Sequence, residues 1–149
     1  MAVFRVRVLM VEDHEPFRRF ICSTLGKTLE WQIVGEASDG LEAVRKAEAL
    51  QPDWITLDLG LPTINGIEAA RRIRKVCPKC KILFVSQMST PDVVQEAPST
   101  GAVGYVVKTR AATDLLAAVE AVLDGRQFVS DGLLGKDFID VRPGLLRTP

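Results

Sequence analysis

No stretch of this sequence is apolar for long enough to cross a membrane, because its longest apolar runs are far below the roughly 18 residues that a spanning helix needs. The first residues do not have the pattern of a signal peptide either. Arg5 and Arg7 interrupt the first apolar run, and the acidic residues Glu12 and Asp13 follow it. We therefore expect a cytoplasmic protein that does not contact a membrane.

The sequence also lacks an excess of charge of either sign. Lysine plus arginine and aspartate plus glutamate each number 19 among 149 residues, so the formal net charge is zero. Without a basic excess, the composition gives no electrostatic reason to bind nucleic acid or an anionic surface. We expect no direct binding of nucleic acid by this chain.

Cysteine is scarce. Cys22, Cys77 and Cys80 are an odd number, which argues against a disulfide framework. Cys77 and Cys80 have CxxC spacing, but a structural zinc site needs four ligands, and the remaining candidates, Cys22 and His14, are far away in the sequence. We favour a structural role in which the pair flanks a turn at Pro78. Metal or redox chemistry is the alternative.

What the sequence does contain is an alternation of short apolar runs and helical segments. Its 47% hydrophobic and 26% charged residues are typical of a single globular domain with one core. The alternation predicts an α/β fold with a parallel sheet. Strands are expected at 6–13, 31–38, 54–57, 81–86 and 104–108.

Helices are expected at 15–25, 39–50, 65–76 and 112–125, with Ser38 or Asp39 signalling the start of the second. Segment 90–102 is a poor helix, because Pro98 lacks a backbone donor. The apolar residues at helical spacing, which we expect to face the core, are Phe17, Phe20 or Ile21, Leu25; Leu41, Val44, Ala47; Ile67, Ala70, Ile73; and Leu115, Leu116, Val119, Val122, Leu123.

Polar and charged residues stand at the downstream ends of four of the expected strands: Glu12 and Asp13, Asp58, Ser86, and Lys108. Each alone has an ordinary explanation as a cap, a turn residue or a solvated edge. The joint pattern is different, because ligands of open parallel sheets bind at the carboxyl ends of the strands. We expect these side chains to meet in one crevice.

The carboxylates in such a crevice determine what it can bind. Crowded carboxylates repel one another unless a cation joins them or their pKa rises. An all-oxygen set of this kind suits Mg²⁺. A phosphoryl group transferred to Asp58, whose carboxylate can act as a nucleophile, would find Lys108 and Ser86 beside it to stabilise its charge. The pattern predicts Mg²⁺-dependent phosphoryl transfer to Asp58.

The segments VEDHEPFRR, VGEASDGLEAV, PDWITLDLGLPTINGIEAARRI and TGAVGYVVK resemble, in order and spacing, the receiver domain of two-component response regulators. The resemblance is to the branch usually fused to a LuxR-type helix-turn-helix, and it covers residues 4–130. It implies a flavodoxin-like, doubly wound five-stranded parallel sheet in order 2-1-3-4-5, with five helices. Residues 131–149 are expected to be a C-terminal tail or truncated linker, with no effector domain.

The resemblance also implies roles for the strand-end residues. Asp58 would accept a phosphoryl group from a sensor histidine kinase or a phosphotransfer protein. Asp13 would bind Mg²⁺ directly, Glu12 largely through water, and Gly60 through its backbone carbonyl.

The resemblance also implies which residues would respond to phosphorylation. Ser86 and Lys108 would contact the phosphoryl group, and Tyr105 would turn inward on activation. The output surface, formed by the fourth helix, fifth strand and fifth helix, would bind a downstream protein or a second copy. Gln87, in place of a small residue, and Pro98, within the fourth helix, depart from the family pattern.

Three functions follow from this pattern. The leading one is a phosphorylation-dependent signalling module that is not an enzyme and acts through protein contacts in a phosphorelay. The alternative is the receiver half of a LuxR-type DNA-binding transcription regulator whose effector domain is absent from this chain. A Mg²⁺-dependent phosphohydrolase using Asp58 is disfavoured, because Gly60 stands where such enzymes commonly place a second acid.

Overall fold

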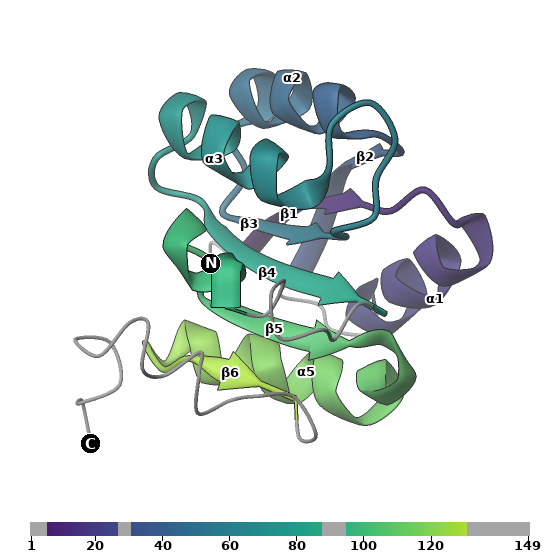
Figure 1. Cartoon of the computed structure of the whole chain (residues 1–149). Helices are drawn as coiled ribbons and strands as arrows, with labels where there is room; N and C mark the ends of the chain where they lie inside the picture. The colour runs from purple at the N-terminus through teal and green to yellow at the C-terminus, as the bar shows by residue number, and fades with distance from the viewer. Residues whose placement is uncertain (1–5, 27–30, 88–94, 131–149) are drawn as a thin grey trace, which may run out of the picture.

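The computed structural model describes residues 6–26, 31–87 and 95–130. Over these ranges the chain forms one parallel sheet in the order β2-β1-β3-β4-β5-β6, with helices on both faces (Figure 1). The strands are β1 (Val6–Val11), β2 (Trp31–Ala37), β3 (Trp54–Leu57), β4 (Lys81–Ser86), β5 (Gly104–Val107) and β6 (Phe128–Val129). The predicted α/β class and the order of the first five strands are confirmed.

The prediction of five strands is wrong, because β6 adds a sixth beside β5. At two residues, β6 is too short to show a hydrophobic period. Its partner Gly104 permits the close approach, since a Cβ there would lie 2.7 Å from the carbonyl oxygen of Phe128. Ser130 extends the pairing by donating its backbone N–H to the carbonyl of Tyr105 at 2.9 Å.

The described helices are α1 (Glu15–Gly26), α2 (Gly40–Leu50), α3 (Gly66–Val76) and α5 (Ala111–Leu123), with 3₁₀ turns η1 (Ala97–Thr100) and η2 (Lys108–Arg110). Of the fourth helix that we expected, residues 88–94 lie outside the described residues. Residues 95–96 are helical and lead into η1, which contains Pro98. The tight 3₁₀ turn at Pro98 agrees with the expectation of a poor helix there.

Side-chain caps explain where two helices begin. Asp39, one of the two predicted candidates, caps α2 by accepting the N–H of Glu42 at 2.8 Å, and Glu42 in return accepts the N–H of Ser38. Asn65 caps α3 in the same way. These bonds satisfy backbone donors that a helix leaves unpaired at its start, so they fix where the chain leaves the preceding loop.

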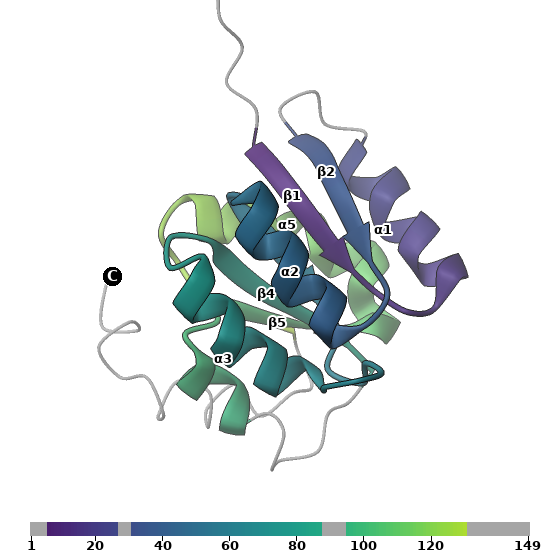
Figure 2. The ribbon, with the colours of Figure 1, turned by 90° about the horizontal axis from the view of Figure 1, so that it is seen from above.

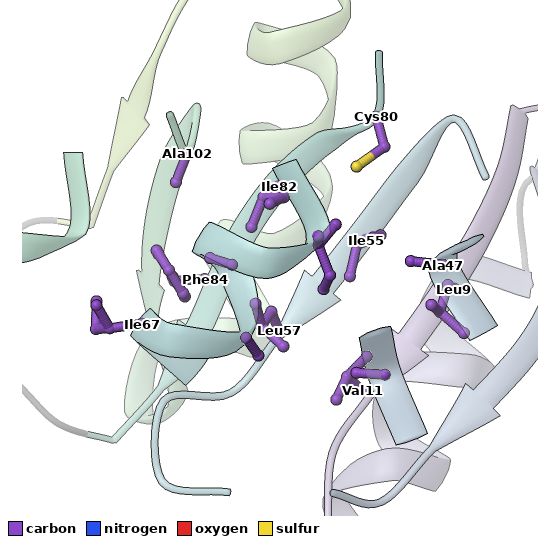
Figure 3. Packing of buried hydrophobic residues seen from close by; sticks show 14 of the residues in the cluster. Leu9, Val11, Ala47, Ile55, Leu57, Ile67, Cys80, Ile82, Phe84 and Ala102 are labelled. Atoms are coloured by element: carbon purple, nitrogen blue, oxygen red, sulfur yellow. The ribbon is translucent and has the colours of Figure 1, made fainter. Parts of the chain in front are cut away.

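Two cores lie on the two faces of the sheet. The face under α2 and α3 includes Ile67, Ala70 and Ile73, as predicted. Figure 3 shows Ile67 of this core together with strand residues such as Leu57 and Phe84. Figure 2 shows these two helices side by side over the sheet, with α1 and α5 behind it. The α1/α5 core, which we define by the buried residues on that face, includes Ile21, Leu25, Leu115, Val119 and Val122.

Two predicted core residues are exposed instead. Leu41 is 38% and Leu116 40% accessible. Ala43 and Ala47 form the buried face of α2, and the small side chains lie close against the sheet while Leu41 stays outside. Leu116 follows Leu115 by one residue, which is a rotation of about 100° around the helix, so it leaves the buried stripe. The side chain of Leu123 lies outside the described residues.

Cys77 and Cys80 lie between α3 and β4, where both are buried and neither forms a disulfide within the described residues. Burial, and then the neighbouring Cys77, raise the pKa of Cys80 to about 12. A thiol that resists ionisation is a poor nucleophile and a poor metal ligand. These observations favour the structural role over metal or redox chemistry.

No helix in the described ranges is long and apolar enough to span a bilayer.

Candidate functional site

The carboxyl ends of β1, β3, β4 and β5 open into a cavity of about 550 Å³. Its lining consists of Asp13, His14, Phe17, Asp58, Gly60, Ser86, Gln87 and Lys108. The strand-end argument predicted that the acids, the hydroxyl and the ammonium would meet at this edge, and the structure brings them together. The sheet arrangement itself therefore creates the site.

The backbone holds the two buried carboxylates at the sheet. The N–H of Glu12 donates to the carbonyl of Ala37 in β2 at 3.0 Å, so Glu12 continues the pairing of β1. The N–H of Asp58 donates to the carbonyl of Val11 at 3.2 Å. Both side chains therefore start from main chain that is fixed by neighbouring strands.

Gly66 packs the start of α3 against the loop that carries Asp58. A Cβ at Gly66 would lie 2.2 Å from the carbonyl oxygen of Asp58, which is far inside a normal contact. The N–H of Gly66 donates to the carbonyl of Leu59 at 2.8 Å. Only glycine permits this approach, so Gly66 fixes where the Asp58 main chain lies.

Lys108 bridges the two carboxylates. Its Nζ lies 2.9 Å from Oε2 of Glu12 and 3.2 Å from Oδ2 of Asp58. The side chains of Glu12 and Asp58 are only 1% and 7% accessible, and that of Lys108 is 13% accessible. This is the partner that an acid at the end of an apolar strand requires, because an unpaired charge in a dry environment is costly.

The pairing is reflected in the pKa values of the bridge. Burial raises the pKa of Glu12, and the charge of Asp58 adds to the rise, while the Lys108 bond and the N–H of His14 oppose it. Burial alone would lower the pKa of Lys108, but the bond to Glu12 and the charge of Asp58 raise it above its ordinary value. Ionising Glu12 therefore costs more here than in water, and a second cation would reduce that cost.

The acids also fit a metal ion. Glu12, Asp13 and Asp58 each offer an oxygen within 4.8 Å of the others. Oε1 of Glu12 is buried and has no hydrogen-bond partner within the described parts of the chain, so one acceptor is left for a ligand or water. Asp13 is exposed, which keeps one side of the group open. This all-oxygen set matches the preference of Mg²⁺.

Gly60 and Ser86, two further predicted residues, also lie on the cavity. Gly60 is exposed, and its N–H donates to Oδ1 of Asp58 at 3.3 Å. Ser86 is buried at the end of β4. Their roles stay predictions.

Tyr105 does not line the cavity. It is fully buried on β5, with its ring centroid 6.0 Å from that of Phe84. Burial raises the pKa of Tyr105, the charge of Asp58 adds to the rise, and a hydrogen bond with Ser86 opposes it. Tyr105 is thus linked to the cavity through Ser86 while its ring belongs to the core.

The sequence interpretation missed two lining residues, His14 and Phe17. Phe17 was placed on the core face of its helix, but it is only half-buried, and its ring centroid lies 4.8 Å from Nζ of Lys108. The available signal was its position, one helical turn after Asp13, which puts it over the strand ends. Gln87, noticed as a departure from the family pattern, is exposed and lines the cavity.

Comparison with known proteins identifies the class that this fold and site define. The sequence model of the response regulator receiver domain matches residues 8–120. The chain belongs to this family and has its flavodoxin-like α/β fold.

The relatives place the chain more narrowly. It is 34% identical over 131 residues to the response regulator protein VraR of Staphylococcus aureus, in an alignment that covers 88% of this chain and 63% of that protein. The chain thus spans less than two thirds of the length of the curated relatives that it matches.

Solved structures of response regulators are similar to this chain in both sequence and fold. A LuxR-family two-component response regulator from Aurantimonas sp. SI85-9A1 is 31% identical, with a TM-score of 0.83 over 93% of this chain and 99% of that one. The receiver domain of the putative response regulator NarL from Mycobacterium tuberculosis is also 31% identical, with a TM-score of 0.77 over 83% of this chain and 99% of that one. The chain is a response regulator receiver domain of the LuxR-associated branch.

Proposed function

We propose that Asp58 is the phosphoryl acceptor of this receiver domain and that its donor is a sensor histidine kinase or a phosphotransfer protein. The observation that supports this most is the bridge from Lys108 to Glu12 and Asp58, at 2.9 and 3.2 Å, inside a cavity that Ser86 also lines. It supplies a nucleophile, a fixed positive charge and a hydroxyl at one point. Phosphoryl transfer depends mainly on such positioning and charge stabilisation.

In the proposed reaction, a carboxylate oxygen of Asp58 forms a bond to the phosphorus of the donor. The bond from phosphorus to the donor nitrogen, or to oxygen in acetyl phosphate, breaks, and its electron pair leaves with the donor. Lys108 would shift part of its hydrogen bonding from Asp58 to the phosphoryl oxygens, while Ser86 donates its hydroxyl hydrogen. Both contacts stabilise negative charge where water is largely excluded.

Mg²⁺ would be held by Asp13, Asp58 and the carbonyl of Gly60, with Glu12 acting largely through water. When bound, the ion neutralises the carboxylates and the oxygens of the phosphoryl group. The unpaired Oε1 of Glu12 is the observation that favours this assignment.

Phosphorylation would then act as a switch. It adds about −1.5 to −2 charge at Asp58. Ser86 responds to that charge, and the hydrogen bond between Ser86 and Tyr105 carries the response to β5. We propose that the fourth helix, β5 and α5 form the output surface, which binds a downstream protein or a second copy in a cytoplasmic phosphorelay. The chain would signal in this way without enzymatic turnover.

The second candidate is that these residues are the receiver half of a LuxR-type DNA-binding regulator. The length of the relatives favours it, because the chain spans only 63% of VraR. In both cases we propose a receiver at residues 4–130 followed by a tail or linker at 131–149. A reading frame that continues into a helix-turn-helix would decide for the second candidate.

The test is incubation with acetyl phosphate and Mg²⁺, followed by intact-mass measurement. Wild type should gain the mass of one phosphoryl group, and Asp58→Asn should not. Asp124→Asn, which changes an exposed acid away from the cavity, is the matched control and should be phosphorylated like wild type. Phosphorylation of Asp58→Asn at the wild-type rate would refute the assignment, and repeated turnover of a phosphatase substrate would favour an enzyme.

A further inference from the structure

The side chain of Lys108 must extend from the end of β5 to the ends of β1 and β3. Lys108 is the first residue of η2, directly after β5, and its ammonium must meet carboxylates that follow β1 and β3. Among the described residues that line the cavity, it is the only lysine or arginine. A lysine side chain has four rotatable carbons and no planar fork to fix its direction, so holding it in one place is entropically expensive. Its position therefore depends on every contact that the ammonium makes.

The carboxylate contacts cannot hold Lys108 equally well throughout a phosphorylation cycle. One of the two carboxylates belongs to Asp58, the proposed acceptor, and its charge and bonding change when it is phosphorylated. The other, Glu12, would also serve the metal ion. Both anions thus have a second role that competes with the lysine.

A third contact of Lys108 involves no group that phosphorylation would alter chemically. Nζ of Lys108 lies over the ring of Phe17, 4.8 Å from its centroid. A cation within about 6 Å of an aromatic face is attracted to the ring electrons, and more strongly where water is excluded. The lysine side chain is only 13% accessible, so solvent weakens this attraction little.

The ring of Phe17 is itself held in place. It packs against the α1/α5 core and against Phe20, at 5.5 Å between ring centroids. Two buried residues further along α1, Ile21 and Leu25, anchor the helix to the sheet. The contact from Phe17 therefore comes from a rigid element on the side of the cavity formed by α1.

We propose that Phe17 is a positioning residue, whose ring holds the Lys108 ammonium over Asp58 in the free and the phosphorylated domain. This inference rests on the proposed function of Asp58 as acceptor. It requires an aromatic ring at position 17, because an aliphatic side chain of similar size fills the space without attracting the cation. A residue that served only to pack the core would have no such requirement.

Phe20 provides the matched control. It lies on the same helix, is also half-buried and packs against the same core, but it does not line the cavity. Replacing either phenylalanine by leucine removes a similar amount of apolar surface. A loss that follows from packing alone should therefore appear in both variants.

The experiment measures phosphorylation of the full chain by acetyl phosphate and Mg²⁺ at several donor concentrations, with intact mass as the readout. Phe17→Leu should lower the limiting rate about three- to tenfold, the size expected for one cation–π contact. Phe17→Tyr, which keeps the ring, should restore most of that loss. Phe20→Leu should lower the unfolding temperature but reduce the limiting rate much less than Phe17→Leu does, because Ile21 and Leu25 still anchor α1 and the Phe17 ring is still present.

A second experiment changes the electrons of the ring with little change in packing, so the variants should fold equally well. Phenylalanine with one, two or three ring fluorines is placed at position 17 alone, which weakens the ring electrons stepwise at nearly constant shape. The rate should fall with each fluorine. Equal rates across that series, or equal rate losses in Phe17→Leu and Phe20→Leu, would overturn the inference. Failure of wild type to become phosphorylated would instead overturn the proposed function.

Discussion

The ammonium nitrogen of Lys108 lies 2.9 Å from Oε2 of Glu12, although the two residues are 96 positions apart in the chain. Glu12 is fully buried, and the bond is formed only when β5 and β1 occupy the same sheet. Burial nevertheless raises the pKa of Glu12, so the attraction of the lysine does not fully offset the cost of burying the charge. The site is thus electrostatically strained before any ligand arrives.

The first prediction concerns the free-energy cost of burying the charged Glu12 side chain. Because the folded pKa of Glu12 exceeds its unfolded value, the folded state binds its proton more tightly, and the free energy of unfolding falls as pH rises from the unfolded pKa through the folded one. Glu12→Gln removes the cost. In the presence of a chelator its unfolding temperature should exceed that of wild type near pH 7, and the difference should shrink towards about pH 4.

The control for Glu12→Gln is Glu48→Gln, which changes an exposed acid of α2. Its difference from wild type should show little dependence on pH. An advantage of Glu12→Gln that grows on acidification would contradict the assignment of the cost to Glu12.

The second prediction concerns Mg²⁺. A ligand that binds only the folded state stabilises it by about 2.7 kcal/mol at one hundred times its dissociation constant. Urea unfolding of wild type with and without Mg²⁺ should show such a gain, and Asp13→Asn should lose most of it. Asp124→Asn should keep it. An equal Mg²⁺ response in Asp13→Asn would show that the ion acts elsewhere.

The third prediction uses Tyr105, the single tyrosine in the sequence. Its alkaline absorbance titration should have a midpoint above the ordinary value near 10, because burial disfavours the phenolate. Since the unfolded state ionises first, the free energy of unfolding should fall as pH rises past about 10. Circular dichroism at each pH separates titration of the folded protein from unfolding.

Two variants of the Tyr105 environment should move that midpoint in opposite directions. Asp58→Asn removes a negative charge that raises the pKa of Tyr105, so the midpoint should fall. Ser86→Ala removes a hydrogen bond that lowers the pKa, so the midpoint should rise. A shift in the same direction for both variants would disprove the link between Tyr105 and the cavity.

The fourth prediction compares two glycines. Gly66→Ala should reduce the free energy of unfolding by about 2–3 kcal/mol, because its Cβ would collide with the carbonyl of Asp58, and it should also slow phosphorylation. Gly26→Ala, at the end of α1, has no atom within 4 Å of its Cβ and should change stability by about 0.5 kcal/mol or less. Urea unfolding checks both, and equal losses would contradict the steric explanation.

The fifth prediction concerns Ser130. Its Oγ donates to Oδ2 of Asp114 at 2.8 Å and accepts the N–H of Val107 at 3.1 Å, so it ties the end of β6 to α5 and β5. Ser130→Ala leaves both partners without this bond and should cost about 1–3 kcal/mol in urea unfolding. Ser23→Ala, an exposed serine of α1, should be nearly neutral. A neutral Ser130→Ala would mean that β6 adds little to the fold.

The sequence was most informative where one local pattern repeats. Apolar runs followed by Asp58, Ser86 and Lys108 were enough to predict the parallel sheet and the edge at which these side chains meet, because strand direction determines both. The three-residue spacing of Ile67, Ala70 and Ile73 predicted the buried face of α3 for a similar reason. In each case the local period and the tertiary contact agree.

The features that sequence missed depend on contacts between distant segments. β6 has no period of its own and is defined by pairing with β5. Leu116 lies next to a buried leucine, and only the direction in which α5 crosses the sheet decides which of the two faces inward. Phe17 reads as a core residue because the position of Lys108, which its ring contacts, is set by a different strand.

The short strand β6 has a consequence for how β5 can be recognised. β6 already forms main-chain hydrogen bonds along the outer side of β5. The N–H of Val107 in β5 donates to the hydroxyl of Ser130. A peptide that binds by adding a strand to a sheet needs such groups free. A partner at this surface must therefore distinguish the domain by its side chains and helices, and the sheets of two copies cannot join edge to edge through β5.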